Sequence, residues 1–130
     1  MKSTLLKNCK ILQGEEFISR HIILEDHKIA HISEHQVPCD DVIDIKGKIV
    51  IPGCIDPHVH FREPGLTSKE DFLSGSKAAA KGGITTFFDM PNVIPPTTTV
   101  ALLEERRELA KKSIVNYGFH FGTSLDNIEE

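Results

Sequence analysis

Two histidines separated by one residue, His58 and His60, are the side chains in this sequence with the clearest capacity for chemistry. They follow an apolar run at residues 49–51 and precede a loop rich in proline and glycine, a pattern typical of the end of a buried strand. Because residues i and i+2 of a strand point to the same face, both imidazoles can reach one cation. The pair therefore predicts half of a metal site, with zinc as the ion that best suits imidazole ligands. The alternative is two polar residues that happen to alternate at a strand end.

Asp56 and Cys54 precede this pair and share its predicted strand face. Asp56 is close enough to accept a hydrogen bond from the His58 ring and so orient it, or it makes a purely structural hydrogen bond. Cys54 lies roughly 13 Å from His58 along a straight strand, which is too far for a shared ligand set. We expect Cys54 to pack in the interior of the fold.

Arg62 continues the same alternation just beyond the histidines. A guanidinium beside a metal ion is repelled unless an anion joins them, so Arg62 indicates a bound carboxylate or phosphate. The alternatives are a solvated loop arginine or an ion pair with Glu63. Asn92 follows the next predicted strand and could share the anion, although asparagine is also common in turns. His120 could line the mouth of such a site, but we expect it to be structural and assign it no ligand role.

The elements that must position these side chains are of two kinds. The first 50 residues consist of short β-type runs between polar turns, which predicts a small β domain. Its predicted strands cover residues 4–12, 17–24, 28–32, 42–45 and 48–51. Residues 51–130 then alternate strand and helix, which is typical of parallel βαβ units with right-handed crossovers. The predicted fold class is therefore α/β.

Within the second part, Thr67 to Glu70 forms a capping-box pattern that is expected to open a helix. Gly82 and Gly83 are expected to close this helix. A buried strand is predicted at residues 84–88, a second helix at 100–112 and a third strand at 113–121. Three strands cannot close an eight-stranded barrel, which takes ~250 residues. We therefore expect either the front part of a longer protein or an open three-stranded α/β unit.

Composition excludes several classes of protein. The chain has 130 residues, a net charge of −4 and 39% hydrophobic residues, which describes an ordinary globular chain without the basic charge of a nucleic-acid binder. No apolar run reaches the ~20 residues of a membrane helix, and the N-terminus lacks a signal-peptide core. The three cysteines have no paired spacing, which suits free thiols in a reducing compartment. The predicted location is the cytoplasm.

Several motifs together resemble the amino-terminal part of the dihydroorotases. The matching segments are residues 52–65, 69–71, 75–86 and 90–92. Dihydroorotases belong to the metal-dependent amidohydrolases, whose fold is a distorted (β/α)8 barrel. Allantoinases resemble the same stretch but carry asparagine in place of Arg62 and lack a counterpart of Asn92. Hydantoinases share the His-x-His motif but lack the motifs around Arg62 and Asn92. The two residues together therefore favour a dihydroorotase.

The resemblance implies a reversible, zinc-dependent cyclisation of N-carbamoyl-L-aspartate to L-dihydroorotate in pyrimidine synthesis. It implies a site with one or two zinc ions, in which His58 and His60 bind one ion. It also implies that Arg62 and Asn92 bind the substrate carboxylate. The bridging carboxylate, two further histidines and the aspartate general acid/base would all lie beyond Glu130, so no catalytic residue is assigned and the isolated chain is expected to be inactive. Expected partners are the small-molecule substrate and either a second copy or a carbamoyltransferase. The alternatives are a non-catalytic dihydroorotase-like scaffold and another cyclic amidohydrolase such as a hydantoinase.

Overall fold

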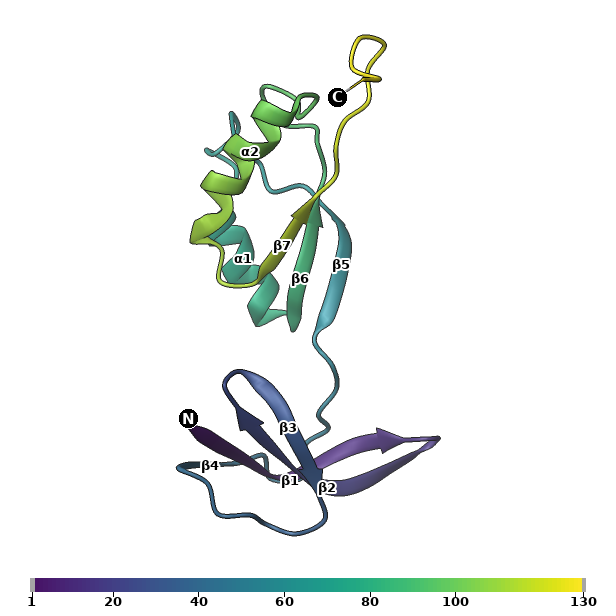
Figure 1. The fold of residues 1–130 in the computed structure, drawn as a ribbon, viewed down its shortest axis with the longest axis vertical. Coiled ribbons are helices and arrows are strands. Elements are labelled where there is room, and N and C mark those ends of the chain that lie inside the picture. The colour runs from purple at the N-terminus through teal and green to yellow at the C-terminus, as the bar shows by residue number, and fades with distance from the viewer. Residues whose placement is uncertain (1, 130) are drawn as a thin grey trace. The chain divides into compact units, whose positions relative to one another are not determined.

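The computed structural model describes residues 2–129, which divide into two units between Pro52 and Gly53. The first unit is a four-stranded sheet in the order β3-β2-β1-β4 (Figure 1). Its strands are β1 (Ser3–Gln13), β2 (Glu16–Glu25), β3 (Lys28–Ser33) and β4 (Asp41–Asp44). β2 runs antiparallel to β1 and to β3, whereas β4 is parallel to β1. The buried apolar residues of the unit are Leu5, Cys9, Ile22 and Ile23.

The fifth strand predicted for this part of the chain, at residues 48–51, is wrong. The segment makes only an isolated bridge, in which the Lys10 amide donates to the Lys48 carbonyl and the Lys10 carbonyl accepts from the Val50 amide. Ile49 and Ile51 remain 55% and 62% exposed in the described chain. Pairing ends here because the next residue is a proline, which has no amide hydrogen for a ladder.

The second unit contains a parallel three-stranded sheet in the order β5-β6-β7. The strands are β5 (Cys54–Val59), β6 (Ile84–Asp89) and β7 (Asn116–Phe119). Helix α1 (Phe72–Lys81) connects β5 to β6, and α2 (Val100–Leu109) with the 3-10 turn η1 (Ala110–Lys112) connects β6 to β7. Both helices cover the same face of the sheet (Figure 1). The predicted α/β class, an amino-terminal β sheet followed by parallel βα units, is confirmed.

An aromatic cluster fills the space between this sheet and its helices. Phe61, Phe72 and Phe87 are all buried, and the Phe61 and Phe87 ring centroids lie 4.4 Å apart. Phe119 packs edge-on against Phe72, with a centroid separation of 5.9 Å. Because Phe61 follows His60 directly, this cluster fixes the backbone on which the candidate site is built.

Helix α1 begins later than the sequence pattern predicted. Its N-cap is Asp71, whose carboxylate accepts from the Ser74 amide at 2.7 Å while the Ser74 hydroxyl accepts from the Asp71 amide. The capping box expected at Thr67 to Glu70 is therefore wrong, and that segment forms turns. The predicted end of the helix is confirmed, since Gly82 is its C-cap and Gly83 follows with a φ of 84°. That conformation favours glycine.

Among the described residues, no helix is long and apolar enough to cross a membrane.

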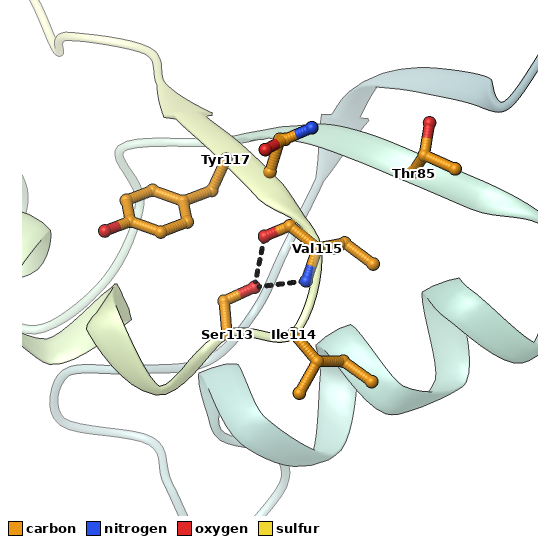
Figure 2. A pocket seen from close by; sticks show the side chains of 6 residues that line it. Thr85, Ser113, Ile114, Val115 and Tyr117 are labelled. Carbon is orange, nitrogen blue, oxygen red and sulfur yellow. Dashed lines mark hydrogen bonds between the residues drawn. The ribbon is translucent and has the colours of Figure 1, made fainter. Parts of the chain in front are cut away.

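The third strand is shorter than predicted because Ser113 interrupts the extended chain before it. The Ser113 hydroxyl donates to the Val115 carbonyl and accepts from its amide, as Figure 2 shows. A cavity of about 590 Å³ lies at this starting end of β6 and β7, lined by Thr85 and residues 113–117. The candidate histidines lie at the opposite ends of the strands.

Candidate metal and substrate site

The two histidines lie close together where β5 ends. His58 belongs to the strand and His60 follows it, and their ring centroids are 5.2 Å apart at an angle of 63°. Strict alternation does not hold along the strand, because the register with β6 shifts between Asp56 and Val59. Asp56 accepts from the His58 backbone amide at 3.1 Å. Of the two roles considered for this carboxylate, the structure shows the structural hydrogen bond.

The side chain of Asn92 contacts the ring of His60. Its Oδ1 atom lies 2.8 Å from Nδ1 of His60. An amide oxygen can only accept, so Nδ1 carries the proton and Nε2 keeps a lone pair that can bind a cation. The amide nitrogen of Asn92 has no partner within residues 2–129 and remains available as a donor. Asn92 can therefore orient the His60 ring and donate to an anion at the same time.

Arg62 is partly exposed, and no carboxylate pairs with it among the residues described. The neighbouring Glu63 is buried and has other partners. One oxygen accepts from Lys112 Nζ at 2.9 Å, and the other accepts from the Phe72 amide at 3.0 Å, at the start of α1. The ion pair between Arg62 and Glu63 that the sequence left open is therefore ruled out. The guanidinium of Arg62 keeps its donors for another anion.

The loops that carry Arg62 and Asn92 pack against each other. The Ile94 amide donates to the Pro64 carbonyl at 3.3 Å. Gly65 has a φ of 85°, and a Cβ atom there would overlap the Ile94 carbonyl oxygen. Only glycine allows this close approach. Glycine at position 65, the last residue of the segment Arg62-Glu63-Pro64-Gly65, thus has a direct structural reason: it allows the two loops to pack together.

Below these loops lies a buried ion pair that the sequence pattern does not reveal. Asp89, the last residue of β6, and Arg106 of α2 are 0% and 1% exposed, and Arg106 Nη2 lies 2.6 Å from Asp89 Oδ2. Burial raises the pKa of the Asp89 carboxyl, while the Phe61 amide and the Arg106 charge act in the opposite direction. Burial likewise lowers the pKa of Arg106. The only signal in the sequence is an aspartate directly after the buried strand predicted at residues 84–88.

His120 and Cys54 lie outside the group formed by the other candidates. Nε2 of His120 is 2.8 Å from the Pro57 carbonyl, so this nitrogen donates and ties the end of β7 to β5. This contact agrees with the structural role expected for His120. Cys54, by contrast, is exposed in the described chain rather than packed in an interior.

The donor set suits part of a zinc site but not a whole one. His58 and His60 are adjacent imidazoles, and the second has its outer nitrogen held by an amide oxygen, as is usual for metal-binding histidines. Across residues 2–129, however, no group of three or more His, Cys, Asp or Glu side chains is placed to hold a metal ion. Catalytic zinc sites usually have three protein ligands.

Comparison with known proteins identifies the family. The profile of the amidohydrolase family matches residues 49–129. The chain belongs to the amidohydrolase family. A dihydroorotase from Methanosarcina mazei is 48% identical to this amidohydrolase over 128 residues, which are 96% of the chain and 28% of the relative. A dihydroorotase from Methanothermobacter thermautotrophicus is 44% identical over 118 residues, which are 90% of the chain and 27% of the relative.

The fold of this amidohydrolase is similar to the solved structures of hydantoinases. An L-hydantoinase from Arthrobacter aurescens matches 98% of the chain and 29% of its own with a TM-score of 0.88 and 33% identity. A D-hydantoinase matches 94% of the chain and 27% of its own with a TM-score of 0.79 and 35% identity. The chain thus spans less than a third of the length of each of these relatives. The likeness to dihydroorotases that the motifs predicted is confirmed.

Proposed function

We propose that this chain supplies one part of a dihydroorotase site, in which His58 and His60 hold zinc and Arg62 and Asn92 bind the substrate carboxylate. The reaction is the reversible cyclisation of N-carbamoyl-L-aspartate to L-dihydroorotate. The observation that carries the proposal is the unpaired guanidinium of Arg62, two residues after His60, with Glu63 engaged elsewhere. Sequence identity of 44–48% with two dihydroorotases supports the same activity.

In this proposal the histidines bind the metal ion, and Arg62 and Asn92 bind the substrate. Zinc bound by these imidazoles would supply a water nucleophile at neutral pH and would polarise a carbonyl for attack. His60 presents Nε2 because Asn92 holds its other nitrogen. The Arg62 fork suits a carboxylate bidentately, and the Asn92 amide nitrogen can donate to the same group. Together they would orient the ring before reaction.

Two histidines are too few ligands for a catalytic zinc, so we propose that the 130 residues are inactive alone. The measurement is dihydroorotate hydrolysis by the purified chain with added zinc and no other protein. We expect no turnover above the uncatalysed reaction. Appreciable hydrolysis would contradict this part of the proposal.

A hydantoinase-like activity is the second candidate, and the similarity to solved hydantoinases favours it. The two activities differ in whether the cyclic substrate carries a carboxylate. 5,6-Dihydrouracil is dihydroorotate without that group, so the two rings separate recognition of the carboxylate from recognition of the cyclic amide. A non-catalytic scaffold would turn over neither compound.

The deciding experiment is Arg62→Met in the full-length protein that contains these residues. Removing the charged partner of a bound carboxylate costs several kcal/mol, so kcat/KM for dihydroorotate should fall at least about 100-fold. Activity on dihydrouracil, whatever its level, should not fall. Lys69→Met is the matched control, because Lys69 is an exposed cation in the loop that follows Arg62. Unchanged dihydroorotate turnover in Arg62→Met would overturn the assignment.

A further inference from the structure

The buried pair of Asp89 and Arg106 makes hydrogen bonds to the backbone close to His60 and close to Asn92, two residues of the candidate site. Asp89 Oδ1 accepts from the Phe61 amide at 2.9 Å, and Phe61 is the residue after His60. Arg106 Nη2 donates to the Met90 carbonyl at 3.1 Å, two residues before Asn92. A single ion pair therefore constrains the chain on each side of the hydrogen bond that joins His60 and Asn92.

Further contacts of Arg106 extend this constraint along the loop and to the third strand. Its Nη1 donates to the Thr97 hydroxyl at 2.8 Å, and Thr97 is itself fully buried. Its guanidinium carbon lies 4.7 Å from the centre of the Phe119 ring at the end of β7. The loop that carries Asn92 is thus held near its beginning by Met90 and near its end by Thr97.

Stability alone does not account for this arrangement. A buried ion pair is often no more stabilising than apolar side chains of similar size, because both charges lose their hydration. Arg106 Nε also has no hydrogen-bond partner, the sole such buried side-chain atom in residues 2–129. What a carboxylate and a guanidinium provide that apolar groups cannot is a set of directed hydrogen bonds to particular backbone atoms.

We propose that Asp89 and Arg106 are positioning residues for the metal ligand His60. By fixing Phe61 and Met90, they hold His60 against Asn92 with Nδ1 protonated and Nε2 free for a cation. The inference rests on the proposed function only for the identity of that cation. The tautomer of the His60 ring is a property of the metal-free protein and can be measured without any turnover.

The test uses two substitutions in the full-length protein. Asp89→Asn preserves the size of the side chain and an acceptor for Phe61 but places an amide against Arg106, whereas Arg106→Lys preserves the charge but loses the planar fork. In the metal-free protein, nitrogen NMR of the histidine rings should show His60 as the Nδ1–H tautomer in the wild type and as a mixture in both variants. Zinc affinity, measured by chelator competition, should fall about tenfold. Arg107→Lys is the matched control, because that neighbouring arginine of α2 is 60% exposed.

The possible outcomes separate positioning from mere support of the fold. If both variants keep the wild-type tautomer and zinc affinity while their melting temperatures fall, the proposal is overturned. If either variant does not fold, Thr97→Val removes only one acceptor of Arg106, and it should move both readouts in the same direction by a smaller amount. If the tautomer changes in the variants but the wild-type protein does not hydrolyse dihydroorotate, the positioning role is supported and the proposed function is refuted. If the wild-type protein hydrolyses dihydroorotate but the variants keep the wild-type tautomer, the proposed function is supported and the positioning role is refuted.

Discussion

Charged side chains are placed differently in the two units of the molecule. In the first unit they form pairs at the surface. These pairs are Lys2–Asp41, Lys7–Asp44 and Arg20–Glu34, and in each of them both side chains are at least 25% exposed. In the second unit Asp89 and Arg106 are almost completely buried, and the Glu63 side chain, which pairs with Lys112, is 8% exposed.

The difference indicates where each unit needs a defined geometry. Exposed pairs contribute little to stability, and the sheet of the first unit is held by apolar packing around Leu5 and Ile22. Buried carboxylates in the second unit accept hydrogen bonds from the Phe61 and Phe72 amides, on either side of the loop that contains Arg62. Buried charge is thus concentrated where the candidate ligands are positioned.

The largest expected effect comes from removing one member of the buried pair. Arg106→Met leaves the Asp89 carboxylate without its partner, so the free energy of unfolding of the second unit should fall by about 3–5 kcal/mol. Arg20→Met in the first unit removes an exposed pair and should cost about 0–1 kcal/mol. Urea unfolding followed by NMR signals from each unit measures both values.

Arg107→Met is the control for substitution on α2, because its pair with Glu104 is exposed on both sides. It should resemble Arg20→Met. Equal losses for Arg106→Met and Arg20→Met would remove the contrast between the units.

A smaller effect is expected at Glu63. Glu63→Gln keeps the shape of the side chain but replaces two charge-assisted hydrogen bonds, to Phe72 and Lys112, with neutral ones or none. The second unit should lose about 1–2 kcal/mol, and α1 should fray first at its N-terminus. Amide hydrogen exchange along α1 detects this fraying. The control is Glu104→Gln on α2, an exposed carboxylate whose neutralisation should change exchange at neither helix end.

Local patterns in the sequence predicted much of this architecture. The β-branched runs of the first unit predict β1 to β4 with ends within two residues of those observed, and Gly82 and Gly83 predict the end of α1. The alternation of strand and helix predicts the parallel sheet. These features depend on residues near one another in the chain, so sequence patterns can detect them.

The features that sequence patterns missed depend on distant contacts. Residues 67–70 and 71–74 both look like helix starts, and the structure uses the second, where Glu63 reaches the Phe72 amide from nine residues away. Of the two roles that the sequence left open for Asp56, the structure shows the structural one, in which its carboxylate accepts from the His58 backbone amide. Asp89 and Arg106 are seventeen residues apart in different elements, and nothing local pairs them.

The smallest expected effect concerns two carboxylates outside the buried core, half-buried Asp71 and exposed Asp40, which should behave alike. The Ser74 amide, the Ser74 hydroxyl and Lys112 lower the pKa of Asp71 to about 2. The Ser3 amide and hydroxyl lower the pKa of Asp40 below its ordinary 3.8. In both cases the folded protein favours the ionised form. The stabilisation from each group is therefore present above about pH 3.8 and is lost as the pH falls through the folded-state pKa. Carboxyl carbon NMR between pH 6 and pH 2 measures both titrations.

Lys112→Met tests whether the pKa values of Asp71 and Asp40 have the same kind of cause. Lys112 lies 3.3 Å from Asp71 and also pairs with Glu63, so its loss should raise the pKa of Asp71 slightly and leave that of Asp40 unchanged. Lys111→Met is the control, because Lys111 pairs with Glu108 instead. A shift at Asp71 alone would mean that the charged network of the second unit extends from buried Glu63 to the surface cap of α1, whereas Asp40 depends on its hydrogen bonds with Ser3. If Asp71 titrates at 3.8 in the wild type, the cap is not formed in solution, and the contrast between the units must rest on the buried groups alone.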